Sequence, residues 1–230
     1  MTSGVVTIII SRYNEALNWT KESPFNKFRY IVYNKGPNEN FCKEFVDKII
    51  TLDNVGRCDH TYLHHVIENY DSLSDIQVFL PGSTGDASKK RKAICILSKI
   101  IESGHKAAYF RSDKINKSIN ELDSFCNFKL DNWRASNKQN RSLNGETKLL
   151  LSTLRPLGLW FIYHFGDMNI CNVSYYGVFS IDNRDILQKP KSFYEKIIRD
   201  VSSHSNPEAG HYIERSWAAI FGPFVYTNVI

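Results

Sequence analysis

The 230-residue sequence has little that would crosslink it or carry it into a membrane. Its five cysteines are scattered and include no C-x-x-C pair, which argues against a disulfide framework and a zinc site and indicates reduced thiols in the cytoplasm. No apolar run reaches the roughly 18 residues of a membrane-spanning helix, and the first residues lack a signal peptide. We therefore expect a soluble protein without a transmembrane segment.

Several catalytic and nucleotide-binding signatures are also missing. The sequence has no G-x-x-x-x-G-K-[ST] P-loop, no G-x-G-x-x-G after its first apolar run, no G-x-S-x-G nucleophile elbow and no H-E-x-x-H zinc motif. The net charge of +5 is mildly basic, and the one dense basic run, residues 89–92, is typical of a solvated helix face. We therefore expect neither a P-loop enzyme nor a dinucleotide Rossmann domain, and no nucleic-acid partner.

Short β-branched runs alternate with helical patterns, which predicts an open α/β fold. The runs expected to form the first strands are residues 5–10, 28–33, 48–52 and 76–80. Amphipathic helices are expected from Asp59, as N-cap, to Tyr70 and over residues 88–102, with Gly104 as the C′ residue of the second. Because strands and crossovers alternate, the sheet should be mostly parallel with right-handed connections, and its first and fourth strands should be neighbours.

The second half of the sequence is less regular. Residues 111–155 are polar and Asn-rich, and we expect a loop-rich region beside the functional site. Two aromatic-rich runs, residues 157–164 and 173–181, are expected to form strands. The chain should end in two helices, over residues 192–201 and from near His211 to Phe221. We expect a single domain over residues 1–230, made of halves 1–105 and 106–230.

Polar residues follow the expected strands, and an open parallel sheet binds ligands at the edge where its strands end. Tyr13 can stack on a base there, while Arg12 and Asn14 can bind ribose or pyrophosphate. The same residues can instead cap a short helix beginning near Glu15. The expected binding rim comprises Ser11, Arg12, Tyr13, Asn14, Tyr33, Asn34, Asn54, Gly56, Arg57, Leu80, Pro81, Gly82 and Ser83.

Arg57 is the strongest single candidate of this rim. Gly56 lets the backbone approach a ligand closely, and Arg57 offers a bidentate fork for phosphate just before a helix N-terminus that favours anions. The alternative is an arginine that caps a neighbouring strand end. His60 and His64 share a helix face, but no third ligand at suitable spacing supports a metal there, and solvent exposure or helix packing is the better interpretation.

Residues 207–217 bring two carboxylates, a histidine, a tyrosine and an arginine together around a helix start. Glu208 is expected in a Pro- and Gly-flanked loop that can reach the rim, whereas a helix would fix the direction of Glu214. Either carboxylate could serve as a general base. A buried Glu214 paired with Arg215 or Arg184 would be structural instead.

Five motifs together carry a resemblance to a known family. They are S-R-Y-N-E at 11–15, Y-N-K-G-P at 33–37, N-V-G-R-x-x-H-T-Y-L at 54–63, E-N-Y-D-x-L-x-D-x-x-V-F-L at 68–80 and G-H-Y-x-E-R-S-W at 210–217. Each is weak alone, but over residues 6–221 the chain resembles a family of formerly unknown-function domains grouped with the GT-A glycosyltransferases. The resemblance extends to a viral member of this family that takes part in building a capsid glycan.

The resemblance implies an αβα sandwich of GT-A type, with a Rossmann-like nucleotide-sugar-binding half, 1–105, and an acceptor-side half, 106–230. GT-A enzymes commonly hold the donor diphosphate through Mn²⁺ or Mg²⁺ bound by a D-x-D motif at the end of the fourth strand. Here that strand ends in Leu-Pro-Gly-Ser. The ion would then be held by Asp86, by His211 or mainly by the donor, or would be dispensable.

The expected function is transfer of a hexose or deoxyhexose, such as glucose or rhamnose, from a UDP-sugar to a glycan or glycoprotein acceptor. By resemblance, the setting is capsid glycosylation in the host cytoplasm, within a larger multidomain protein. Arg57 would stabilise the leaving diphosphate, with Glu208 or Glu214 as general base. The alternative is a non-catalytic nucleotide- or carbohydrate-binding domain of a glycan-assembly complex, which the missing D-x-D favours.

Overall fold

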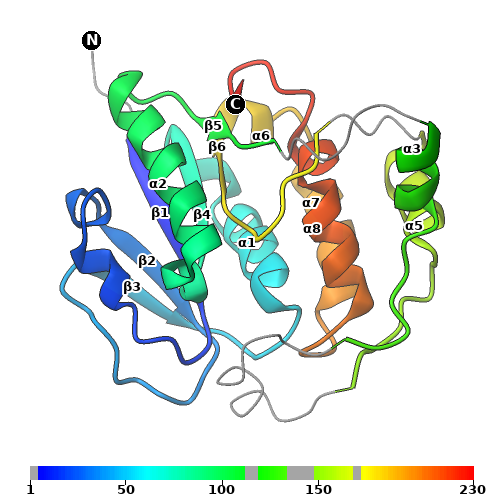
Figure 1. Ribbon diagram of the computed structural model, residues 1–230, viewed down its shortest axis with the longest axis horizontal. Helices are drawn as coiled ribbons and strands as arrows, with labels where there is room; N and C mark the ends of the chain where they lie inside the picture. The colour runs from blue at the N-terminus through cyan, green and yellow to red at the C-terminus, as the bar shows by residue number, and fades with distance from the viewer. Residues whose placement is uncertain (1–4, 112–118, 134–147, 168–171) are drawn as a thin grey trace.

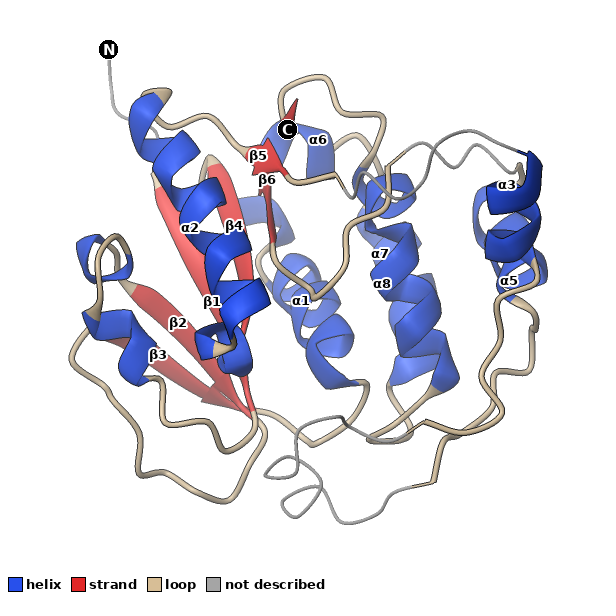
Figure 2. Ribbon diagram, in the orientation of Figure 1, coloured by secondary structure: helices blue, strands red, loops and turns tan. Residues whose placement is uncertain are grey.

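The computed structural model describes residues 5–111, 119–133, 148–167 and 172–230. A five-stranded sheet has helices on both of its faces (Figures 1 and 2). Its strand order is β3-β2-β1-β4-β6, with β1 (Val6–Arg12), β2 (Tyr30–Asn34), β3 (Val46–Thr51), β4 (Ile76–Pro81) and β6 (Phe179–Asp182). The first four strands are parallel, and β6 runs antiparallel to β4. The expected α/β fold with a mostly parallel sheet is therefore confirmed.

The remaining elements surround this sheet. The helices are α1 (Arg57–Glu68), α2 (Ala87–Glu102), α3 (Ile119–Cys126), α5 (Leu157–Phe165), α6 (Asn183–Ile186), α7 (Lys191–Ile198) and α8 (Glu208–Phe221). Short 3₁₀ helices are η1 (Asn18–Lys21), η2 (Phe25–Lys27), η3 (Tyr70–Ser72), η4 (Gly82–Gly85) and η5 (Arg199–Val201). Strands β5 (Ala108–Tyr109) and β7 (Asn228–Val229) form a separate parallel pair.

Alternation along the central strands divides the core into two layers, because successive side chains of a strand point to opposite faces. Ile8 and Ile10 of β1 belong to the cluster that contains the buried face of α2. Ile9 between them belongs to the cluster that contains residues of α1, α7 and α8. Strands buried on both faces carry continuous β-branched runs, which is why β1 was recognisable in the sequence.

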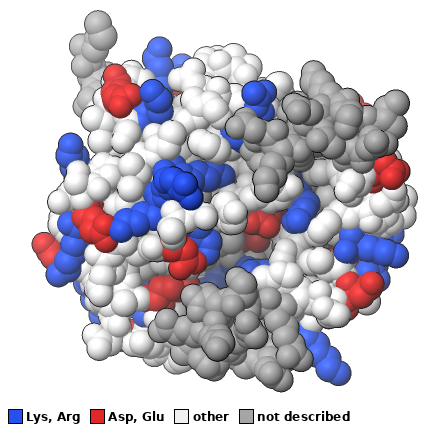
Figure 3. All heavy atoms as spheres, in the orientation of Figure 1, with Lys and Arg blue, Asp and Glu red and all other residues white. Residues whose placement is uncertain are grey.

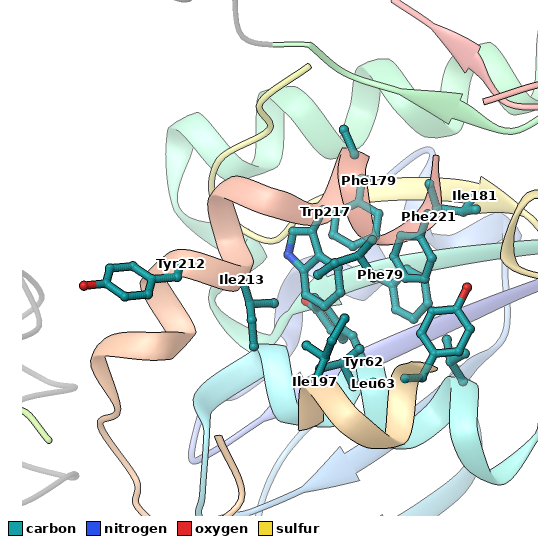
Figure 4. Close-up of a cluster of buried hydrophobic side chains, with 14 of the residues drawn as sticks. Tyr62, Leu63, Phe79, Phe179, Ile181, Ile197, Tyr212, Ile213, Trp217 and Phe221 are labelled. Atoms are coloured by element: carbon teal, nitrogen blue, oxygen red, sulfur yellow. The ribbon is translucent and has the colours of Figure 1, made fainter. Parts of the chain in front are cut away.

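The second layer is rich in aromatic side chains contributed by distant parts of the chain (Figure 4). Trp217 and Phe221 stack on successive turns of α8 with ring centroids 5.4 Å apart, and Trp217 lies 5.2 Å from Phe179 of β6. Phe79 of β4 and Tyr62 of α1 also belong to this group, with their ring centroids 4.9 Å apart. These contacts fix α8 against α1 and thereby position the residues of its first turns beside the strand ends.

Strands β1 and β4 are neighbours in the sheet, as predicted. Ile10 is paired with Leu80 of β4 and with Val32 of β2, so β1 lies in the middle of the parallel set. Consequently the loops after β1, β2 and β4 leave the sheet at the same edge. The expected helices over residues 88–102 and 192–201 are also found, as α2 and as α7 with η5, and Gly104 follows α2 with a φ of 67°.

Several local expectations are wrong. Residues 157–164 form helix α5, because Leu157, Trp160, Phe161 and His164 are buried at helical spacing. A run that is apolar on all sides does not distinguish a helix from a strand. Within 173–181, only residues from Phe179 onward form a strand. Among the described residues no helix is long and apolar enough to cross a membrane.

Two helix starts also differ from expectation. Helix α1 begins at Arg57 with Gly56 as a left-handed N-cap, so Asp59 lies inside the first turn and is not the cap. Helix α8 begins at Glu208 rather than near His211, because Pro207 provides the extended residue that precedes it. Both differences change the environment of a candidate site residue.

Candidate functional site

The ends of the parallel strands meet the first turns of α1 and α8 beside a hollow in the molecular surface. Figure 3 shows this hollow in the middle of the face, between the positions of α2 and α8, with both acidic and basic side chains around it. The loops after β1, β2 and β4 all emerge at this edge. The structure therefore brings the predicted rim residues to one edge, although many of them point into the protein.

Arg12 is the clearest case of a rim residue with an internal role. Its side chain is only 1% exposed and donates hydrogen bonds to the backbone oxygens of Glu15 (2.7 Å) and Asn38 (2.6 Å) and to Asn34 Oδ1 (2.5 Å). The guanidinium also lies 4.1 Å from the ring of Phe41, and its burial lowers the pKa. Arg12 thus ties two loops together, and its predicted direct contact with a nucleotide does not fit this geometry.

Four further rim residues are buried by similar ties. The hydroxyl of Ser11 lies 2.8 Å from that of Thr61, and the Tyr33 hydroxyl lies 2.9 Å from His65 Nδ1. Asn14 Oδ1 accepts from the Asn38 backbone N–H, and Asn34 Oδ1 accepts from Arg12. Of the residues predicted around strand β1, the half-buried Tyr13 is the one that stays partly accessible.

Glycines allow these loops to pack very closely. A Cβ on Gly36 would lie 1.6 Å from the Tyr13 carbonyl oxygen, and one on Gly82 would lie 2.6 Å from a Glu15 carboxylate oxygen. That Glu15 oxygen accepts hydrogen bonds from the backbone N–H groups of Tyr13 (2.7 Å) and Asn14 (3.1 Å). The β1, β2 and β4 loops therefore form one packed unit. Leu80 and Pro81 are buried within it, and Ser83 is partly exposed at its edge.

Buried Lys35 holds the loop that carries Arg57. Its ammonium donates to the backbone oxygens of Val55 (2.5 Å) and Arg57 (2.6 Å). Burial lowers the pKa of Lys35 to about 7, with Cys58 and Asp59 opposing the shift. Both Gly56 and Arg57 have a positive φ, at 56° and 54°. Glycine adopts this conformation without strain, but arginine does not. A strained residue such as Arg57 persists only where its surroundings hold it, and such strain is concentrated at functional sites.

Arg57 extends from this loop toward α8. One of its guanidinium nitrogens lies 3.0 Å from His211 Nε2, and its Cζ lies 3.9 Å from the ring of Trp133. Burial, with Arg57 and Arg215, lowers the pKa of His211 to about 3, so the imidazole is neutral near pH 7 and its Nε2 accepts from Arg57. This is the one hydrogen bond found for the Arg57 side chain among the described residues, so further N–H donors stay available to an anion.

Glu214 is the candidate base that is partly exposed. Its side chain is 25% exposed, its Oε1 accepts from the Tyr176 backbone N–H at 2.8 Å, and its Oε2 lies 3.7 Å from Arg215. Arg215 is itself held by the His211 backbone oxygen (3.0 Å) and by the Phe128 ring, 3.7 Å from its Cζ. Glu214 is therefore oriented by one firm hydrogen bond but is not locked in a close ion pair.

Glu208 does not lie in a loop that reaches the rim. It is the first residue of α8 and is fully buried. Its oxygens accept from the backbone N–H groups of Leu130 (2.8 Å) and Ser152 (2.9 Å) and from the Tyr212 hydroxyl (2.8 Å), and Arg155 lies 3.2 Å away. A carboxylate with this set of donors joins chain segments, and the prediction of Glu208 as a general base is corrected accordingly.

The two predicted metal ligands do not fit a metal site. Asp86 pairs with Lys89 at 2.9 Å on the solvent side of α2, while His211 is engaged by Arg57. Within the described ranges, no group of three or more His, Cys, Asp or Glu side chains could hold a metal ion. His60 and His64 stack with ring centroids 5.9 Å apart, as expected of helix-packing histidines.

Three further groups near the site were missed by sequence reasoning. Lys92, on the buried side of α2, donates to Ser174 Oγ and to the Tyr175 backbone oxygen (2.7 Å), and burial lowers its pKa to about 7. Asp59 is buried, one of its oxygens has no partner among the described residues, and burial, with the Glu214 charge, raises its pKa to about 8. Trp133 lay in the polar, weakly periodic segment 111–155, and no signal in the sequence joined it to Arg57.

Comparison with known proteins gives a family but no chemistry. A family model described as "Protein of unknown function (DUF3431)" matches residues 7–227, which is nearly the whole chain. No curated protein matches the chain. The site itself is therefore the guide to function.

Proposed function

The chain belongs to the DUF3431 family, whose function is unknown, and we propose from the site that the protein transfers a sugar from a UDP-linked donor to a glycan acceptor. The observation that carries the proposal is the placement of Arg57. An arginine with spare N–H donors, on a clamped loop at the N-terminus of α1 and at the ligand-binding edge of a parallel sheet, suits a diphosphate.

The arrangement also supports a GT-A type of αβα sandwich. The parallel strands β1 to β4 form the nucleotide-binding side, and β6 joins them antiparallel from the second half of the chain. Helix α8 then brings acceptor-side residues to the same edge. A crystal structure with UDP bound at the ends of β1 and β4 is the expected result, and UDP bound elsewhere would contradict the assignment.

The proposed chemistry uses two of the described side chains. In an inverting transfer, the acceptor hydroxyl oxygen attacks the anomeric carbon as the bond from that carbon to the diphosphate oxygen breaks. Glu214 takes the proton of the acceptor hydroxyl, and Arg57 stabilises the negative charge that develops on the leaving diphosphate. The Tyr176 N–H fixes the direction of the carboxylate. No step is assigned to a metal, because the residues predicted to hold one do not form a site.

Calorimetry with UDP, UDP-glucose, GDP and NAD⁺, with and without Mn²⁺, tests donor binding. We expect UDP and UDP-glucose to bind, and Arg57→Ala to weaken that binding at least about tenfold, the value of one charge-assisted contact. Arg29→Ala is the matched control, because Arg29 precedes β2 at the opposite end of the strand and pairs with Asp47 on the surface. Failure of every nucleoside diphosphate to bind would refute the proposal.

Release of UDP in the presence of glycan acceptors tests the chemistry. Glu214→Gln should leave UDP binding nearly unchanged and lower transfer by about 10²–10⁴-fold, the loss expected for a general base. Glu102→Gln, at the exposed end of α2, should leave both unchanged. Binding of UDP without turnover on any acceptor would instead favour a non-catalytic binding domain, the rival that the absent D-x-D motif supports.

A further inference from the structure

A loop crosses the face of the molecule between α2 and α8, and is here called the crossing segment, residues 172–178 (Figure 1). Lys92 of α2 binds it through the backbone oxygen of Tyr175 (2.7 Å) and the hydroxyl of Ser174. On the other side, Glu214 of α8 accepts from the Tyr176 N–H at 2.8 Å. From beneath, the Tyr62 hydroxyl donates to the Gly177 oxygen at 2.9 Å. The segment is therefore held from three helices.

Tyr176 is exceptional within this segment. The residue is 49% exposed, whereas every other residue of the segment is buried or half-buried. Among the described residues, its side chain makes no hydrogen bond and no contact with another ring. Tyr176 also has a φ of 76°, a conformation that costs free energy for any residue with a Cβ and that tyrosine rarely adopts.

Backbone shape alone does not explain a tyrosine here. The next residue also has a positive φ, 62°, and is glycine, the residue that adopts this conformation without strain. A Cβ on Gly177 would lie 3.1 Å from Cys58 Sγ, so shape and space both select glycine there. At position 176 the chain instead keeps a large aromatic ring, exposed and strained, one hydrogen bond away from the Glu214 carboxylate.

We propose that the Tyr176 ring is the stacking platform for the acceptor sugar, and so a specificity-determining residue; this rests on the proposed function of the site. The C–H face of a pyranose is apolar and slightly positive, and it suits the negative face of an aromatic ring. The backbone N–H of Tyr176 holds Glu214, so a sugar on the ring has its hydroxyls beside the proposed base. The nucleotide, at Arg57 and the strand ends, occupies the other side of the site.

The test compares Tyr176→Phe, Tyr176→Ala and Tyr176→Gly with the wild type. The probes are the methyl glycosides of glucose, galactose, mannose, xylose and rhamnose and the disaccharides of these sugars, followed by saturation-transfer NMR. We expect binding of the preferred sugar to be kept in the Phe variant and weakened about two- to tenfold in the Ala and Gly variants. Tyr163→Ala, an exposed tyrosine on α5, is the control and should not change binding.

Thermal unfolding and UDP calorimetry on the same variants separate the explanations. Because glycine removes the strain, Tyr176→Gly should melt about 2–4 °C above Tyr176→Ala, so that its weaker sugar binding is not the result of unfolding. UDP affinity should be unchanged in all three variants. Three results would each refute the proposed role of the Tyr176 ring. They are a wild type that binds none of the sugars, equal sugar binding in all variants, and a loss of UDP affinity in the Ala variant.

These readouts also separate this inference from the proposed function. If no nucleoside diphosphate binds the wild type while Tyr176→Ala and Tyr176→Gly lose sugar binding, the platform stands and the transferase proposal fails. If UDP binds and is turned over while the Tyr176 variants keep full sugar binding, the transferase proposal stands and the platform fails.

Discussion

Replacing Glu208 by glutamine should destabilise the protein strongly, although the change preserves the shape of the side chain. Each carboxylate oxygen accepts from a backbone N–H, Oε1 from Leu130 and Oε2 from Ser152. Glutamine has one acceptor oxygen and one NH₂ group. Whichever way the amide is turned, its NH₂ group faces one of these backbone N–H groups, and two donors meet in a buried place.

The size of the effect follows from these contacts. One donor left without an acceptor costs about 1–3 kcal/mol, and each hydrogen bond that loses its charged acceptor gives up about 1 kcal/mol more. The Tyr212 hydroxyl also donates to Oε1, so two hydrogen bonds lose their charged acceptor even when the NH₂ group faces Ser152. The total is about 3–5 kcal/mol, the range found when one partner of a buried charged group is removed. For a chain of this size that corresponds to a melting temperature about 10–15 °C lower.

Differential scanning calorimetry of Glu208→Gln measures this loss directly, and Glu214→Gln is the matched control. Glu214 is partly exposed, and a glutamine oxygen can still accept from the Tyr176 N–H, so the control should lose less than about 1 kcal/mol. If Glu208→Gln melts together with the wild type, Glu208 is not the junction described here, and its role as a catalytic group returns for consideration.

Two further predictions concern stability. Gly36→Ala should lower the free energy of unfolding by about 3 kcal/mol or more, because its Cβ would overlap the Tyr13 backbone oxygen. Gly104→Ala should lower it by about 1 kcal/mol, because Gly104 has a φ of 67° but open space around it. Equal losses of the two variants in urea unfolding would contradict the packing of the loops. Burial, with the charge of Glu214, raises the pKa of Asp59 to about 8, so the folded protein keeps a proton that the unfolded chain releases near pH 4, and stability falls as pH rises between these values. Asp59→Asn should therefore gain stability relative to the wild type from pH 5 to pH 8.5, and a constant difference in the free energy of unfolding would refute a neutral Asp59.

The fold was largely predictable because its central strands obey a simple rule. Strands β1 and β4 are covered on both faces, so their sequences are largely apolar, interrupted only by Thr7 and Gln77 before their last residues. Helix α2 follows from one apolar stripe at helical spacing. Helix α5 escaped the same reasoning, because its apolar residues extend beyond the face that packs against α8 and leave no polar side from which a period could be read.

The sequence predicted that the candidate residues gather where the parallel strands end, but not the direction in which their side chains point. A polar residue at a strand end can contact a ligand or can fasten a neighbouring loop, and only its three-dimensional partners decide between these roles. Arg12 and Glu208 turned out to fasten loops, through partners such as Asn38 and Ser152 that no spacing rule connects to them. Lys35 was passed over for the same reason, since a lysine after a strand resembles any solvent-exposed lysine until its carbonyl partners are known.

The hydrogen bond between Arg57 and His211 joins residues that are 154 positions apart. The loop with its arginine comes early in the chain, and the helix that completes the site is made almost last. During synthesis, a chain that has emerged only as far as β6 contains the five strands of the central sheet and Arg57, but neither His211 nor Glu214. Docking of α8 is thus the last step in bringing Arg57 and His211 together, and a chain truncated before α8 lacks both His211 and Glu214.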